Sequence, residues 1–345
     1  MTARALTAVR WAGRPGRRPL WSLLVMLAAF LVIPAMSGEE LTTNNFYDIS
    51  QNFASLGLVA LALALTMIAG EFDIAIPATF LLGSMVAVKF GQHAAALGIA
   101  LALAAGALAG LAQGTIIAKL KLNSMSVTLG GYLAILGVVY LLGHSNTVEF
   151  ENYALGIALE KARLFDVISI RAGVSIAVFV VVAILLWTTR LGPELRAVGA
   201  DRRSARTAGV EADRTLIAVF VASGVLPALA GALQGYALAY AAPSTSTSAL
   251  IFAATAALLG GVSLSGGVGT VAGVAAGVLT LGLLEELLVV LAASEYLNSL
   301  VTGGLLVFVA LLSAPGLVLR WRAVAARRRS RALSSANAGA RVDPT

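Results

Sequence analysis

The chain has 345 residues, of which 59% are hydrophobic and 12% charged, and its mean hydropathy is +0.90. This composition excludes a water-soluble enzyme and indicates a protein that crosses the membrane many times. The formal charge of +7 comes from arginines beside apolar runs, a pattern typical of membrane orientation and not of nucleic-acid binding. The absence of cysteine excludes disulfides, and the two isolated histidines, His93 and His144, do not indicate a metal site.

Apolar segments alternate with short polar loops along nearly the whole chain. A helix needs about 20 residues to cross the hydrocarbon core of a bilayer, and most of these segments approach or exceed that length. The sequence therefore predicts an all-α polytopic membrane protein with about ten transmembrane helices. The predicted spans are Leu20–Met36, Phe53–Gly70, Thr79–Phe90, Ala94–Ala118, Met125–Leu142, Ala172–Thr189, Leu216–Tyr240, Ala249–Leu264, Thr270–Ala292 and Leu297–Ala314.

The basic residues predict which side of the membrane each loop occupies. Five of the 24 Lys and Arg precede the first span, two follow the fourth, six lie in the loop after the sixth and seven follow the tenth. The positive-inside rule then places both termini in the cytoplasm and favours an even number of spans. We expect residues 1–19 to be a basic tail, 20–318 the transmembrane domain with its polar loop at 190–215, and 319–345 a disordered tail. The basic residues left outside are Lys89, Lys161, Arg163 and Arg171.

Ten spans divide into two halves of five, Leu20–Leu142 and Ala172–Ala314. An odd number of spans in each half inverts the second half relative to the first, as in many transporters. The two halves share little sequence identity, so the predicted inverted repeat depends on the number of spans.

The longest polar run between apolar segments is LRAVGADRRSARTAGVEADR, Leu195–Arg214. Gly199 and Gly209 bracket a stretch of good helix formers with Asp201 near its start, where an acid complements the helix dipole. We expect a short helix at the cytoplasmic surface that binds another protein. A plain basic loop held inside by its charge is the simpler interpretation.

A second distinctive run is LLGGVSLSGGVGTVAGVAAG, Leu258–Gly277. Glycine at this density allows sharp turns and close helix contacts, so we interpret its glycines as structural. A phosphate-binding loop is excluded because no G-K-[ST] follows and no strand precedes the run. The glycines in question are Gly260, Gly261, Gly266 and Gly267.

Polar residues inside the apolar spans are candidates for a solute pathway, because acids in membrane segments are costly. Asp73 lies in GEFDIAIPA, where a glycine and a proline predict a broken helix; a solvated cytoplasmic turn is the alternative. Thr128, in NSMSVTLGG, either contacts solute or bonds its own helix backbone. Glu285 and Glu286 either line the pathway or lie in water at the outer interface.

The pattern R-A-V-G-A-D-x-x-x-A-R-x-x-G-V-x-x-D-R closely resembles the coupling segment of ribose- and xylose-type sugar permeases, the membrane subunits of ATP-binding-cassette (ABC) importers. V-T-L-G at Val127–Gly130 and the glycine-rich run resemble motifs of the same family. Leu250 and Phe252 stand where the family often has acids, and Glu285–Glu286 where it usually has an amide pair. The resemblance therefore leaves the solute open.

This resemblance implies a permease without catalytic residues or bound cofactor, in the cytoplasmic membrane. Its partners would be an ABC ATPase subunit that holds ATP and Mg²⁺, an extracytoplasmic solute-binding protein, and a second permease copy or paralogue. The implied ATPase-coupling residues are Gly199, Asp201, Ala205, Arg206 and Gly209.

Two other functions compete with the sugar importer. A branched-chain amino-acid permease shares the coupling pattern, although its usual N-F-A-H-G motif is absent. A proton-coupled secondary transporter would use Asp73 and Glu285 as proton carriers and would need no ATPase.

Overall fold

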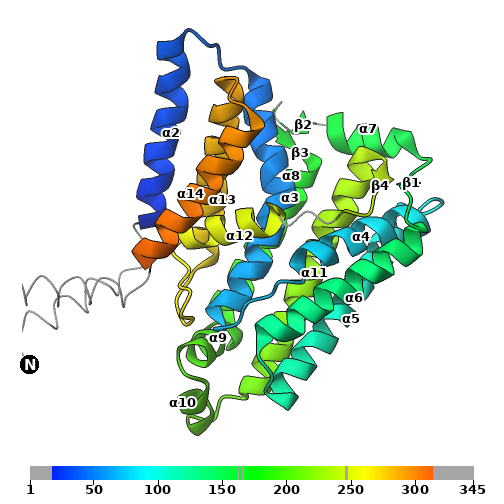
Figure 1. Ribbon diagram of the computed structural model, residues 1–345, viewed down its shortest axis with the longest axis vertical. Helices are drawn as coiled ribbons and strands as arrows, with labels where there is room; N and C mark the ends of the chain where they lie inside the picture. Colours follow the sequence, from blue (N-terminus) through cyan, green and yellow to red (C-terminus); the bar gives the residue numbers. More distant parts are fainter. Residues whose placement is uncertain (1–17, 162, 165–166, 245–247, 314–345) are drawn as a thin grey trace, which may run out of the picture.

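The computed structural model describes residues 18–161, 163–164, 167–244 and 248–313, and these are mostly helical. The predicted terminal tails lie outside the described residues, apart from the first residues of α2. Figure 1 shows α2, α3, α13 and α14 leaning together on one side, and α4, α5, α6 and α11 on the other. The short helices α9 and α10 lie at one end of the molecule, and α7 lies at the opposite end (Figure 1).

The first half of the chain contains five apolar helices, and each corresponds to one predicted span. They are α2 (Arg18–Ser37), α3 (Thr43–Ile68), α4 (Ile76–Phe90), α5 (Ala95–Leu120) and α6 (Ser124–Gly143).

The second half contains five more apolar helices and three shorter ones in its loops. The elements are α7 (Tyr153–Lys161), α8 (Ile170–Thr188), α9 (Leu191–Ala200), α10 (Arg202–Thr207), α11 (Ala212–Leu238), α12 (Ser248–Leu259), α13 (Val271–Val290) and α14 (Glu295–Ser313). Two-residue strands form two small antiparallel pairs: β1 (Val148–Glu149) with β4 (Tyr240–Ala241), and β2 (Arg163–Leu164) with β3 (Ile168–Ser169).

Seven helices in the described part of the chain are long and apolar enough to span a membrane: α2, α3, α5, α6, α8, α11 and α13. Helices α4, α12 and the apolar part of α14 are shorter. The all-helical membrane architecture is therefore confirmed, whereas crossing by these three shorter helices stays a prediction, as does the inverted repeat.

Helix α3 begins ten residues earlier than the predicted span, at Thr43 instead of Phe53. A capping box of Thr42 and Asn45 starts the helix. The added turns carry polar residues, which lowered the local hydropathy and concealed the helix. From Gly57 to Ile68 every residue of α3 is buried, among α8, α11, α12 and α13.

The predicted break after α3 is confirmed. Gly70 has a φ of +78°, which favours glycine, and Pro77 lies in the first turn of α4, where its missing N–H costs no helical bond. The break separates α3 from α4 and leaves residues 70–75 as an irregular loop.

Candidate functional site

The segment 190–215 forms two consecutive helices, where the sequence predicted one. Asp201 ends α9 and begins α10. Its carboxylate accepts hydrogen bonds from the Ser204 hydroxyl and from the Arg203 amide, the latter at 3.0 Å. These bonds hold the pKa of Asp201 below its ordinary value of 3.8. The predicted short helix after Asp201 is confirmed, and α9 was missed although Leu191, Leu195 and Val198 have helical spacing.

The two helices divide their residues between the core of this chain and its surface. Ala205 is buried and packs with the core that surrounds α3. Exposed side chains of α10 point away from that core, and one of them, Arg206, is paired with Asp213 at 2.5 Å. A partner protein would therefore meet the exposed face, and Ala205 positions α10 from beneath. The exposed residues of α10 are Arg203, Ser204, Arg206 and Thr207.

Gly199 lies where three segments of backbone cross. A Cβ atom at Gly199 would lie 1.8 Å from the carbonyl oxygen of Ile68 and 2.7 Å from the amide nitrogen of Gly267. The Gly267 amide itself donates to the Ile68 carbonyl at 2.9 Å. No side chain fits here, so glycine is needed for close approach. We name Ile68, Gly70, Gly199, Gly266 and Gly267 the backbone junction.

The junction places the glycine-rich run in contact with the α9–α10 segment. Gly266 and Gly267 have φ values of +79° and +74°, and a Cβ atom at Gly266 would lie 2.4 Å from the carbonyl oxygen of Gly199. Gly261 also has a positive φ, and Gly260 packs against the first turn of α13 at Gly273. These positions suit the structural role expected of the four glycines.

An ion pair joins α10 to the loop after α3. Arg202, the first residue of α10, contacts the carboxylate of Glu71. The two side chains are 28% and 14% exposed, so solvent screens the pair only in part. Sequence reasoning missed this pair because 131 residues separate its members.

Asp73 is 4% exposed, so it does not lie in a solvated turn. One carboxylate oxygen accepts from the Ser223 hydroxyl of α11 at 2.5 Å, and the other accepts from the Ala75 amide at 2.9 Å. A carboxylate buried this deeply is retained only where bonds of this kind replace water. Asp73 therefore fixes the loop to α11.

Helix α6 holds the other side of the same loop. The Thr128 hydroxyl accepts from the Ile74 amide at 3.1 Å and donates to the Ser124 carbonyl of its own helix at 2.8 Å. The Ser124 hydroxyl accepts from the Phe72 amide at 3.3 Å. The structure thus brings Thr128 and Asp73 to one loop, and the expected bond to the helix backbone is present.

The structure does not bring the candidate Glu285 into this group. Glu285 and Glu286 lie in the last two turns of α13, far along the helix from the junction at its start. Glu286 is buried and accepts a hydrogen bond from the side-chain amide of Asn45, on α3, at 2.8 Å. Glu285 is partly exposed. Among the described residues, no group of three or more His, Cys, Asp or Glu could hold a metal.

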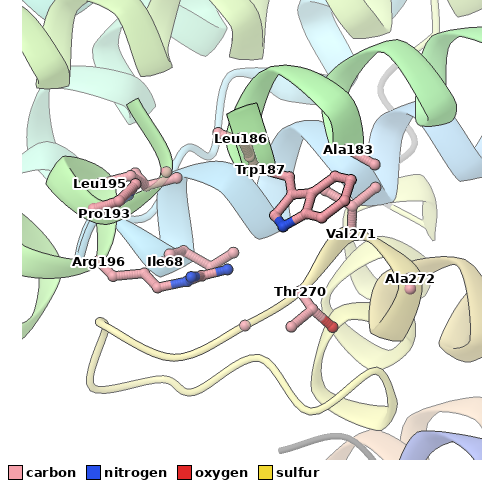
Figure 2. Close-up of a pocket in the computed structure, with 12 residues that line it drawn as sticks. Ile68, Ala183, Leu186, Trp187, Pro193, Leu195, Arg196, Thr270, Val271 and Ala272 are labelled. Atoms are coloured by element: carbon pink, nitrogen blue, oxygen red, sulfur yellow. The ribbon is translucent and has the colours of Figure 1, made fainter. Parts of the chain in front are cut away.

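A cavity of about 360 Å³ lies beside the junction, between α8, α9 and the start of α13. Figure 2 shows Trp187 and Arg196 on one side of the cavity and Thr270 and Ala272 on the other. Helix α9 is therefore closely packed against Ile68 and has open space on another face.

Comparison with known proteins identifies the family. Residues 45–310 match the family described as branched-chain amino acid transport system, permease component. This chain belongs to that family.

Several curated relatives of this permease import sugars. It is 30% identical over 292 residues to the L-arabinose transport system permease protein AraH of Escherichia coli, an alignment covering 82% of this chain and 87% of that protein. It is 31% identical over 278 residues to the fructose import permease protein FrcC of Rhizobium meliloti, covering 78% and 76%. It is 28% identical over 311 residues to the ribose import permease protein RbsC of Escherichia coli, covering 87% and 95%. No solved structure matches this permease.

Proposed function

We propose that this permease carries a sugar or a sugar-like polar solute into the cell as the membrane subunit of an ABC importer. The observation that carries the proposal is its similarity to the arabinose, fructose and ribose permeases over 78–87% of its length. The family description mentions branched-chain amino acids, but the named relatives that cover this chain most fully import sugars.

We assign ATP hydrolysis to a separate ATPase subunit that binds the exposed face of α10. Its motion would reach α3 and the loop at 70–75 through two connections, the Arg202–Glu71 pair and the backbone junction. Asp73 and Thr128 then pass the displacement to α11 and α6. A solute-binding protein and a second permease copy would complete the importer.

The position of Asp73 disfavours a proton-coupled secondary transporter. A proton carrier must exchange protons with water on both sides of the membrane, and both oxygens of Asp73 are bonded inside the protein. Glu285 lies on α13, near the C-terminal end of that helix, whereas Asp73 lies in the loop after α3. The two acids therefore do not form a relay.

The short helices support the proposed ten-span inverted arrangement. Helix α4 is the third apolar helix of the first half, and α12 is the third of the second half. Both are shorter than the other spans, and short or interrupted segments at corresponding positions are typical of inverted-repeat transporters. In this arrangement α9 and α10 are cytoplasmic and α7 is outside, and a reporter inserted at Tyr153 should be accessible from outside the cell.

Reconstitution tests the proposed function directly. The permease, reconstituted with its ATPase subunit and solute-binding protein, should take up L-arabinose, D-ribose or D-fructose into proteoliposomes only when ATP is present. Sugar uptake by the permease alone would contradict the proposal.

Charge reversal on α10 tests the proposed ATPase contact. Arg203→Glu and Arg206→Glu should weaken binding of the ATPase at least tenfold, because both side chains lie on the exposed face. Lys119→Glu is the matched control, since it reverses an exposed charge at the end of α5 and does not touch α10. Equal losses in all three variants would show that net charge, and not this face, governs binding.

A further inference from the structure

Polar side chains form a stripe along the outer turns of α3. Asp48, Gln51, Asn52 and Ser55 are spaced by three and four residues, so they share one face of the helix. Asp48 is exposed and the other three are partly exposed, whereas α3 is buried from Gly57 onward. Polar residues on one face of a membrane-embedded helix mark a water-filled cavity or a solute path.

The inner end of this stripe meets two polar side chains from other helices. The side-chain oxygen of Gln234, on α11, accepts from the Ser55 hydroxyl and from the Arg171 guanidinium of α8, each at 2.6 Å. Arg171 is 5% exposed, and Gln234 is partly exposed between the buried neighbours Leu233 and Gly235. We name Gln51, Ser55, Arg171 and Gln234 the outer polar site.

Two amide side chains at this site retain unused hydrogen-bonding capacity. The side-chain oxygen of Gln51 is buried without a partner among the described residues, while its nitrogen donates to the Tyr47 hydroxyl at 2.8 Å. The side-chain nitrogen of Gln234 makes no bond to the described part of the chain, although its oxygen makes two. Among the described residues, these two amide side chains therefore leave one acceptor oxygen and one donor nitrogen without a partner.

We propose that the outer polar site binds the hydroxyl groups of a neutral, polyhydroxylated solute on its way from the binding protein to the cytoplasm. A hydroxyl both donates and accepts, so the hydroxyl groups of one solute can donate to the Gln51 oxygen and accept from the Gln234 nitrogen. The stripe and the site together carry one acid, Asp48, and one base, Arg171, so their formal charges balance and favour neither a cationic nor an anionic solute. The proposal rests on the proposed function and names the class of solute.

A structural cross-brace between α3, α8 and α11 is the competing explanation, and the chain contains a brace for comparison. The Ser175 hydroxyl, one turn beyond Arg171 on α8, donates to the Ala54 carbonyl of α3 at 2.8 Å. Ser175 is fully buried, so it joins two of the same helices without reaching a solute.

The experiment compares Gln234→Leu with Ser175→Ala in the purified permease–ATPase complex. Thermal unfolding is followed with L-arabinose, D-ribose or D-fructose added up to roughly 100 mM, because a ligand of the folded state raises Tm with concentration. We expect at least one sugar to stabilise the unchanged complex. Gln234→Leu should lower the affinity for that sugar at least tenfold. Ser175→Ala should lower Tm but leave the affinity for that sugar as it is in the unchanged complex.

Ser55→Ala serves as a second variant in case Gln234→Leu does not fold. It should lower the affinity for the same sugar several-fold. Unchanged sugar affinity in the folded Gln234→Leu or Ser55→Ala complex would establish a cross-brace and overturn the proposal, as would the absence of stabilisation by all three sugars. ATP-dependent uptake by the unchanged complex is measured separately. Uptake without binding at this site would overturn this inference and leave the proposed function intact.

Discussion

The two ends of α3 are built in different ways. The inner end, from Gly57 to Ile68, is fully buried and finishes at the backbone junction, where backbone touches backbone. The outer end carries the stripe from Asp48 to Ser55, whose contacts are made by partly exposed polar side chains. One helix therefore has a closely packed, buried end and a polar, partly exposed end.

This difference matches two tasks within a transporter. Backbone contacts leave no rotamer freedom, so a displacement of α9 must move the end of α3 with it. In the proposed outer polar site, side-chain contacts can be replaced by contacts to a solute, because an amide and a hydroxyl can each both donate and accept.

Gly199→Leu should have the largest effect, because its Cβ alone would lie 1.8 Å from the Ile68 carbonyl oxygen. The backbone must move, so we expect a destabilisation of at least about 3 kcal/mol and loss of folded protein in size-exclusion chromatography. Gly137→Ala in α6 is the control, since a Cβ atom there meets nothing within 4 Å in this chain. A folded Gly199→Leu protein with normal uptake would show that the junction is not closely packed.

Asp73→Ala should destabilise the protein by about 2 kcal/mol, since it leaves the Ser223 hydroxyl and the Ala75 amide without an acceptor. Asp73→Asn keeps one acceptor oxygen and should cost less. Thermal unfolding measures both variants. The double variant Asp73→Ala, Ser223→Ala tests whether the two residues interact. If its loss of unfolding free energy equals the sum of the losses in the two single variants, Asp73 and Ser223 are not coupled.

Glu286→Leu, at the outer end, should destabilise the protein less, by about 1 kcal/mol, because it removes one hydrogen bond from the side-chain amide of Asn45. Glu286→Gln should be nearly neutral, since its amide oxygen still accepts from Asn45. Chemical unfolding in detergent compares the two variants. A loss in Glu286→Gln as large as in Glu286→Leu would mean that the charge itself is required.

Lowering the pH should loosen the start of α10, with a smaller effect on stability than the substitutions at Gly199, Asp73 and Glu286. The folded-state pKa of Asp201 is lowered by the bonds from Ser204 and Arg203, so its stabilising contribution is present above pH 3.8 and is lost as the pH falls through the folded pKa. Hydrogen exchange of the α10 amides should therefore gain an acid-dependent component. Asp201→Asn caps the helix without titrating and should abolish that component; an unchanged acid response in this variant would assign the effect to another group.

Local physical chemistry accounts for the parts that were predictable. Long apolar runs can be stable as membrane helices, so each predicted span corresponds to a helix. The break at Gly70 and Pro77 and the start of α10 at Asp201 follow from backbone conformation and from capping, which involve residues a few positions apart. The start of α3 was misplaced because its polar stripe resembles a loop in any average of hydropathy.

The amino-acid sequence by itself determined the membrane class, the order of the helices, the broken segment after α3 and the motifs that resemble sugar permeases. Tertiary structure alone decided which distant residues meet: Glu71 with Arg202, Asp73 with Ser223, and Gln234 with both Ser55 and Arg171. It also decided that Gly199 and Ala205 face the permease's own core. The physical reason is that propensity and hydropathy depend on neighbours in the chain, whereas these contacts depend on how helices more than 60 residues apart pack against one another.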